Sequence, residues 1–379
     1  MTLEDPHVSD SAPAAGGRSV RDGGRRGARL LGSSGLSGII LYVLVFALAI
    51  TPVPYLLQTP GPVVNTLEPY EGVDLVSISG TETYEAEGTL DMLTVAVAGG
   101  PGRDIFAAQA VTSLINGVET VVPSEAYYPL STTRDEVEAA NSTDMISSQD
   151  EATAAALTEL DIDYDSVIGV SQVVEDSAAA GVVEPGDHIL AVDGQDIAGT
   201  EEGMAEVRQA VVDSTGPIEL TLDRDGETVD ATVEPVEADG VRSIGVVMSR
   251  AYRFPFDVDF AVEGIGGPSA GTIFALTIID LLTEGNLTGG EAIAGTGAID
   301  ASGQVSPIGG ARQKVAAAAA SGAEYFLSPA DNCAEVLGAR GVDELTVVRI
   351  DDLSAAHQAV ASIAAGDTGD LPTCTDAAQ

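Results

Sequence analysis

The sequence predicts an α+β protein with an N-terminal transmembrane helix and two further domains. Three observations support this fold class: an apolar segment at 36–57, short strands around one helix at 165–240, and helices alternating with short buried strands at 250–365. The chain has 379 residues, 45% of them hydrophobic, which is enough to bury more than one core. We therefore expect separate domains joined by short connections.

The N-terminal region has the features of a membrane anchor. Residues 1–35 are rich in Gly, Ser, Ala and Arg, which predicts a disordered, basic cytoplasmic tail. Arginines at 18, 21, 25, 26 and 29 precede the apolar segment 36–57, and this asymmetry predicts a cytoplasmic N-terminus. The segment reaches the ~20 residues that span a bilayer only by including Pro52 and Pro54.

A cleaved signal peptide ending near Ala47–Ala49 is the alternative to a retained anchor. Because apolar sequence continues through Tyr55–Leu57, we favour a single-pass anchor in the cell membrane. Under either interpretation, the bulk of the chain lies outside the cytoplasm.

Composition and charge exclude two classes of function. The net charge of -43 would repel phosphate, so nucleic acid is not an expected partner. His7, His188 and His357 are far apart in the sequence and show no metal-ligand spacing, so we expect no metal site.

The extracytoplasmic segment 58–164 contains one strand pattern and one helix pattern. Gly88–Ala98 alternates in hydrophobicity as strands do, and Thr143–Leu160 reads as a moderately amphipathic helix. Because the region after 250 is short for a complete domain, we expect Gly88–Leu160 to supply its first strand and helix. The domain at 165–240 would then be an insertion.

The region 165–240 resembles a PDZ domain, a small β-sandwich or barrel with helices. The resemblance rests on the motif S-A-A-A-G-V-V-E-P-G-D-H-I-L-A-V-D-G, residues 177–194, followed by a helix at Thr200–Val212 and a hairpin. It implies that a peptide is bound as an added strand, with its C-terminal carboxylate held by backbone N–H groups. By this resemblance the carboxylate loop is Asp165–Gly169, with Val167, Ile168 and Gly169 as its binding residues. A structural spacer domain is the alternative.

A glycine-rich run at 262–275, V-E-G-I-G-G-P-S-A-G-T-I-F-A, surrounds Ser269. Glycine permits the tight turn, and Pro268 suits the first turn of a helix. Ser269 is thus expected at a helix N-terminus, where backbone N–H groups, including that of Gly267, are candidate donors to an oxyanion.

Lys314 is the only lysine in the chain, since fifteen of the sixteen Lys and Arg residues are arginine. A buried lysine can lose its proton and act as a base, whereas arginine does not. The pattern indicates a position where arginine could not replace lysine, because the side chain there must lose its proton. The alternative is that Lys314 is simply the last lysine of an arginine-biased composition.

G-G-P-S-A-G followed by T-G-A-I-D-A-S-G-Q-V-S-P-I-G-G-A-R-Q-K resembles the proteolytic domain of Lon, a serine peptidase with a Ser–Lys dyad. The resemblance covers about Val258–Val348. Together with the anchor and the PDZ domain, it is similar to the membrane-anchored PDZ–Lon peptidases of the YlbL type. It implies Ser269 as nucleophile, Lys314 as general base and Thr296 as the hydroxyl that bonds the lysine amine. Lon commonly has lysine-aspartate before the serine loop, and this chain has Ile265-Gly266-Gly267 instead.

The resemblance also implies protein or peptide substrates, a homo-oligomer such as a hexamer, and no cofactor. Lon carries an ATPase module, but the single lysine here is followed by Val315, which excludes the G-K-[ST] phosphate loop from this sequence. We therefore expect a domain organisation of 36–57 anchor, 165–240 PDZ domain, 250–365 proteolytic domain and 366–379 loose tail. In an oxidising compartment, Cys333 and Cys374, the only cysteines, are expected to form a disulfide.

Two alternatives stay open. The Lon-like domain could be inert, which would make the chain a membrane-tethered adaptor that binds partners through its PDZ domain. The glycine-rich run also resembles the ATP loop of certain small-molecule kinases, although a position outside the cytoplasm does not suit an ATP-dependent enzyme.

Overall fold

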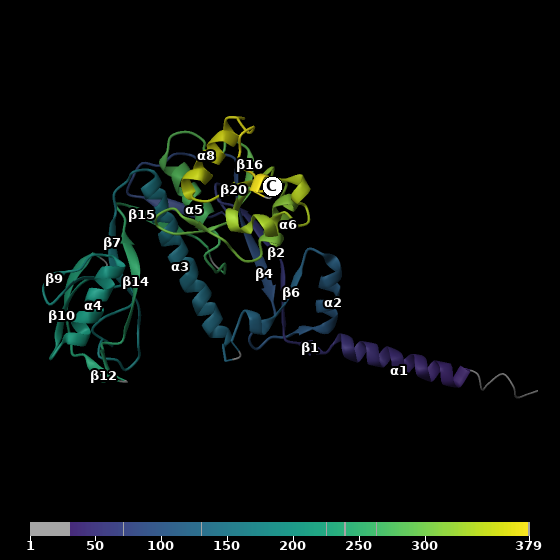
Figure 1. Cartoon of the computed structure of the whole chain (residues 1–379), viewed down its shortest axis with the longest axis horizontal. Coiled ribbons are helices and arrows are strands. Elements are labelled where there is room, and N and C mark those ends of the chain that lie inside the picture. The colour runs from purple at the N-terminus through teal and green to yellow at the C-terminus, as the bar shows by residue number, and fades with distance from the viewer. Residues whose placement is uncertain are drawn as a thin grey trace, which may run out of the picture. The chain divides into compact units, whose positions relative to one another are not determined.

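The computed structural model describes residues 31–377 except positions 71, 130, 225, 239 and 263, so most of the predicted cytoplasmic tail lies outside the described residues. The chain divides into two compact units, the first ending at Thr51 and the second beginning at Pro52 (Figure 1). The first unit holds one described helix, α1 (Leu31–Ala49). Among the residues described, we find no helix whose length and apolar character together would suffice to cross a membrane.

The predicted anchor at 36–57 is wrong in its second half. Helix α1 ends at Ala49, and the following residues form strands β1 (Pro52–Val53) and β2 (Tyr55–Asn65). Leu56 is buried in the core of the second unit, where it pairs with Val122. The apolar residues after the alanines therefore belong to a strand of a folded domain, with Leu56 in its core, and they give no support for a longer apolar helix.

The second unit contains a large and a small domain (Figure 1). The large domain is built on one sheet in the order β20-β19-β16-β4-β2-β6. Strands β4, β16, β19 and β20 run parallel, while β2 is antiparallel to β4 and β6. The bounds not yet given are Thr89–Ala98 for β4, Thr120–Pro123 for β6, Ala292–Gly295 for β16, Tyr325–Pro329 for β19 and Thr346–Ile350 for β20.

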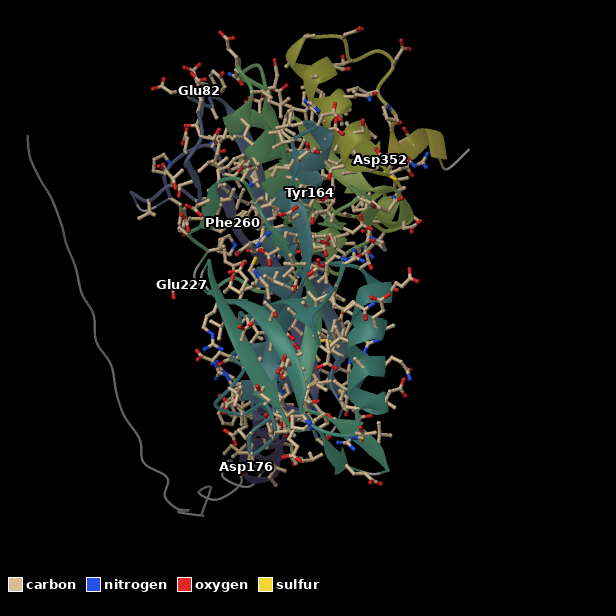
Figure 2. The ribbon with its side chains drawn as sticks, turned by 90° about the vertical axis from the view of Figure 1, so that its left-hand side faces the viewer. Glu82, Tyr164, Asp176, Glu227, Phe260 and Asp352 are labelled. Atoms are coloured by element: carbon tan, nitrogen blue, oxygen red, sulfur yellow. A yellow bond between two sulfur atoms is a disulfide. The ribbon has the colours of Figure 1, made fainter. Side chains whose placement is uncertain are left out.

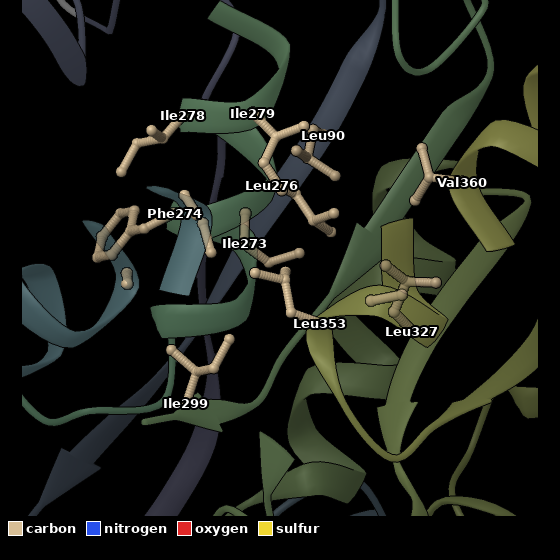
Figure 3. Close-up of a cluster of buried hydrophobic side chains, with 14 of the residues drawn as sticks. Leu90, Ile273, Phe274, Leu276, Ile278, Ile279, Ile299, Leu327, Leu353 and Val360 are labelled. Atoms are coloured by element: carbon tan, nitrogen blue, oxygen red, sulfur yellow. The ribbon is translucent and has the colours of Figure 1, made fainter. Parts of the chain in front are cut away.

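Helices cover both faces of this sheet because its strands are apolar on both sides. In β4, Met92 contributes to a core with helices α3 (Arg134–Glu159), α5 (Gly271–Leu282) and α8 (Leu353–Ala364), and the next residue, Leu93, to a core with α6 (Ala311–Ser321) and α7 (Cys333–Val336). In β19, Leu327 belongs to the first of these cores and the preceding residue, Phe326, to the second. Figure 3 shows the first core, in which every residue of α5 from Gly271 to Asp280 is buried.

Segments from both sides of the small domain in sequence build the large domain. Strand β4 contains Thr94–Ala98 and pairs with β16, and α3 packs on α5, which agrees with the expectation for Gly88–Leu160. Helix α3 begins nine residues before the predicted start because Thr133 and Glu136 form a capping box. The residue limits predicted for the domains stay predictions.

The small domain is a sheet in the order β11-β10-β8-β7-β14, with helix α4 (Glu201–Asp213). Its strands are β7 (Asp165–Val173), β8 (His188–Val192), β10 (Ile218–Arg224), β11 (Glu227–Val233) and β14 (Val246–Arg253), and β9 (Gln195–Asp196) pairs with β8. Tyr164 packs against Tyr252 and Phe254 where the chain enters and leaves this domain, with ring centroids 5.7 Å apart in each pair (Figure 2).

Two-stranded pairs complete the fold. They join β1 with β5 (Ile105–Phe106), β3 (Val76–Ser79) with β15 (Asp257–Phe260), β12 (Val236–Ala238) with β13 (Val241–Ser243), and β17 (Ala298–Ile299) with β18 (Val305–Ser306). At the end of β15, Phe260 packs edge-on against Phe274 of α5, with ring centroids 5.1 Å apart. Helix α2 (Ala107–Asn116) follows β5 directly.

The C-terminal tail is docked at Leu371–Cys374, contrary to the prediction of a loose segment at 366–379, whereas residues 366–370 are exposed. A disulfide joins Cys333 to Cys374, and Leu371 and Cys374 are buried. The tail also adds a β-bridge between Thr373 and Val348 before the short helix α9 (Cys374–Ala377). The disulfide confirms the expectation from the sequence. The burial of Leu371 and the bridge at Thr373 were not predicted, because a few apolar residues in a polar tail give no periodic signal.

Candidate functional site

The site lies where the two helical layers of the large domain meet beyond the end of β16. Ser269 precedes α5 on one face of the sheet, and Lys314 lies in α6 on the other. The Nζ of Lys314 is 2.7 Å from the Oγ of Ser269, although the two residues are 45 positions apart in sequence. The structure thus brings together the two residues that the sequence singled out.

Thr296, the residue after β16, orients the amine. Its hydroxyl donates to the carbonyl oxygen of Ser269 at 2.9 Å, so its oxygen is left as an acceptor. The Lys314 Nζ lies 2.9 Å from the hydroxyl oxygen of Thr296 and donates to it. A neutral amine that donates to Thr296 can turn its lone pair toward the Ser269 hydroxyl, which is the arrangement that a general base needs.

Lys314 is buried, with 2% of its surface exposed. Desolvation by burial lowers the pKa of its amine from 10.5 to about 7. Near neutral pH a large fraction of the amine is therefore uncharged.

The loop before α5 is held by α3. The N–H of Gly267 donates to the carbonyl oxygen of Asn141 at 3.1 Å, and the Ser148 hydroxyl donates to the carbonyl oxygen of Pro268 at 3.1 Å. Gly267 is therefore not a free oxyanion donor in this conformation, which corrects the prediction. Its φ of 88° lies in the left-handed region, as the predicted tight turn requires.

Helix α5 begins at Gly271, two residues after Ser269, so Ser269 and Pro268 lie in the loop and not in the first turn of the helix. The Ser269 carbonyl is fixed by the N–H of Gly297 at 3.0 Å as well as by Thr296. Sequence reasoning missed the supporting residues Asn141 and Ser148, because nothing in a helical pattern indicates which side chains face a distant loop.

A cavity of about 310 Å³ opens beside the two residues. It is lined by the β4 segment Leu93–Ala96, by Met145 of α3 and by the loop that contains Ile265. Strand β16 pairs with β4 only as far as Met92, and within the described residues no strand continues that side of β4 toward Ala98. The cavity is thus bordered by an open strand edge, which can pair with an extended peptide.

The predicted carboxylate-binding residues Val167, Ile168 and Gly169 are not in a loop. They lie in β7, an interior strand, where Ile168 pairs with Ile189 on one side and Arg250 on the other. Their backbone groups are engaged in sheet pairing, so they cannot receive a carboxylate. The prediction was wrong because these residues lie in a strand that is paired with β8 on one side and with β14 on the other.

A groove on the same domain lies between α4 and the start of β14. It has a volume of about 430 Å³ and is lined by Val207, Arg208, Val211, Val212 and by residues 241–244 and 246–248. Strand β14 is the edge of the small sheet, so the sheet can accept another strand there. The sequence contains I-G-V twice, at 168–170 and 244–246, and only the second copy lies at this groove.

Comparisons with known families match both domains. Residues 262–358 match the model of the Lon protease (S16) C-terminal proteolytic domain. Residues 135–234 match the model of the PDZ domain. The second match begins inside α3 and ends before β14, whereas the small sheet begins at Asp165 and includes β14.

One curated relative is a Lon protease from Phenylobacterium zucineum, 42% identical over 69 residues, which are 18% of this chain and 8% of that protein. Solved structures similar to this chain include the PDZ domain of an SdrC-like protein from Listeria innocua, 23% identical, covering 22% of this chain and 92% of that one, with a TM-score of 0.19. Another comes from Geobacillus thermodenitrificans, 26% identical, covering 21% and 94%, also with a TM-score of 0.19.

Proposed function

We propose that this chain, which contains a PDZ domain and a Lon S16 C-terminal proteolytic domain, is a membrane-attached serine endopeptidase with a Ser269–Lys314 dyad. A Lon proteolytic domain implies a serine peptidase. The observation that carries the proposal is the contact of 2.7 Å between a serine hydroxyl and a buried amine whose pKa is lowered to about 7.

In this mechanism the neutral amine of Lys314 takes the proton of the Ser269 hydroxyl as its oxygen attacks a peptide carbonyl. The resulting ammonium then gives that proton to the leaving amine, and the C–N bond breaks to leave an ester on Ser269. Water, deprotonated by the same amine, hydrolyses the ester. Thr296 accepts from the amine throughout and keeps it aligned.

The substrate would bind as an extended strand along the open edge of β4 beside the cavity. The apolar groove between α4 and β14 would hold a peptide segment of the same or another protein, with Arg208 available to a carboxylate. Oligomers such as hexamers are part of the proposal by analogy with Lon.

The proposed location is outside the cytoplasm. Two observations support it: the cluster of arginines before an uncharged apolar stretch, and the disulfide between Cys333 and Cys374, which persists in oxidising compartments. The charge of -43 and the absence of a G-K-[ST] phosphate loop in the sequence support protein substrates over nucleic acids or ATP.

The deciding experiment compares the full-length chain with the Ser269→Ala, Lys314→Arg and Lys314→Met variants. Each is incubated with an unfolded fluorescent polypeptide and with a peptidyl acylating probe. We expect cleavage and labelling by the native chain only, while binding of peptides to the PDZ groove is retained in all four. Equal cleavage by the native chain and Ser269→Ala would refute the proposal, and intact peptide binding without any cleavage would favour the adaptor.

A further inference from the structure

Helix α2 has an unusual orientation on the large domain. Its apolar residues Val111, Leu114 and Ile115 are 57%, 69% and 80% exposed, whereas Ser113 is buried. Positions 111, 114 and 115 lie on one face of a helix, together with Ala107. The polar residues Gln109 and Ser113 lie toward the opposite face. The helix therefore presents its apolar face to the outside, the reverse of a surface helix in a water-soluble domain.

The exposed face continues onto the preceding strand and is free of charge. Phe106, the residue before the helix, is 50% exposed. Residues 105–118 read I-F-A-A-Q-A-V-T-S-L-I-N-G-V and contain no acidic or basic residue, in a chain of which 20% is charged. Contiguous exposed apolar residues without charge mark a contact surface. We call this surface, made of Phe106, Val111, Leu114 and Ile115, the α2 face.

Chain connectivity indicates what the α2 face contacts. Only Ile50 and Thr51 separate the apolar helix α1 from β1, and β1 pairs with β5, Pro52 opposite Phe106. Three residue steps of about 3.5 Å each keep the end of α1 within roughly 11 Å of the start of β1. Strand β1 is paired with β5, the strand that leads directly into α2. The α2 face therefore starts at the place where the apolar N-terminal segment joins the folded domain.

We propose that the α2 face rests on the surface of the lipid bilayer that holds the N-terminal segment. This inference rests on the membrane attachment in the proposed function and goes beyond it by assigning a second contact. An apolar helix face inserted at the headgroup boundary is stabilised by burial of its side chains. Because the face has no charge, it does not depend on anionic lipids, and the acidic remainder of the chain would be repelled by them.

A single short face binds membranes weakly by itself. Tethering by the N-terminal segment makes the contact intramolecular and raises its effective concentration. The contact would fix how the large domain stands on the membrane. The test must therefore use the full-length chain in a membrane and not the isolated domain in solution.

The experiment uses full-length chain reconstituted in phosphatidylcholine vesicles, with a nitroxide on Ile115→Cys or, as control, on Gln358→Cys. Gln358 is exposed on α8, at the other end of the large domain from α2 (Figure 1). We expect the label at 115 to collide with oxygen more than with a water-soluble nickel complex, and the label at 358 to show the reverse. Leu114→Glu, placed beside the label at 115, should increase its accessibility to nickel about tenfold.

The outcomes separate this inference from the proposed attachment. A chain that does not float with vesicles would refute the attachment itself. A chain that floats while the labels at 115 and 358 are equally accessible to nickel would refute the contact of α2 alone. Shielding accompanied by dipolar broadening that vanishes on dilution with unlabelled chain would assign the α2 face to a second copy, which also overturns the proposal.

Discussion

Because Lys314 is the only lysine in the chain, labelling lysine with ¹³C at Cε gives a single side-chain signal that reports the protonation of this amine. The perturbation is a pH titration between 5 and 11. Burial lowers the pKa of the amine from 10.5 to about 7, which corresponds to about 5 kcal/mol in favour of the neutral form. We expect the signal to titrate near pH 7.

The same titration governs activity and stability. The rate of acylation should rise with pH through about 7, because only the neutral amine accepts the Ser269 proton. For stability, the folded pKa lies below the unfolded value. Below about pH 7 the amine is protonated in both the folded and the unfolded state, and the buried charge lowers the free energy of unfolding by its full amount. Between pH 7 and 10.5 the amine is protonated only in the unfolded chain, so the free energy of unfolding rises with pH.

Lys314→Met removes this pH dependence and serves as the reference. The difference in free energy of unfolding between Lys314→Met and the native chain should shrink by about 3 kcal/mol from pH 7 to pH 10. Denaturant unfolding of both proteins at the two pH values measures it, and other titrating groups cancel in the comparison. A lysine signal that titrates near 10.5, with no change in this difference, would mean a hydrated amine and would refute the mechanism.

Four further predictions concern residues around the dyad and the two domains. Thr296→Val should reduce kcat/KM about 10- to 100-fold because the amine loses the acceptor that aligns it, whereas Thr143→Val on the exposed side of α3 should not; equal values in a peptide-cleavage assay would contradict this role. Gly297→Ala would place Cβ in collision with the Thr272 hydroxyl and should lower both activity and melting temperature, while Gly216→Ala, with no atom within 4 Å, is the neutral control. Replacing Cys333 and Cys374 with serine opens a loop of 41 residues and should lower the free energy of unfolding by about 4 kcal/mol, with earlier proteolysis of the tail. An unchanged midpoint of denaturant unfolding would show that the packing of Leu371 holds the tail without the disulfide. Val247→Asp in the groove beside α4 should weaken binding of a C-terminal peptide about tenfold, measured by fluorescence anisotropy. Val174→Asp, which is also exposed in the same domain but lies outside the groove, should leave binding unchanged.

The sequence by itself determined the chemistry of the site. Ser269 in its glycine-rich run and Lys314 as the only lysine could be identified because their residue types are rare in such surroundings. Strand β4 and helix α5 were also predictable, since each has a strong local pattern of apolar residues. Motifs and apolar patterns are local, and the number of lysines is a simple count, so all three can be obtained from a single sequence.

Only the tertiary structure decided which I-G-V segment lies at the groove of the small domain, because two identical tripeptides differ solely in the strands that pair with them. The same holds for Tyr55–Leu57, which read as membrane sequence until β2 was found paired inside a sheet. It also holds for the pKa of Lys314, which depends on burial by segments distant in the chain. Pairing and desolvation are long-range properties, and apolar residues near each other in sequence do not show which surface buries them.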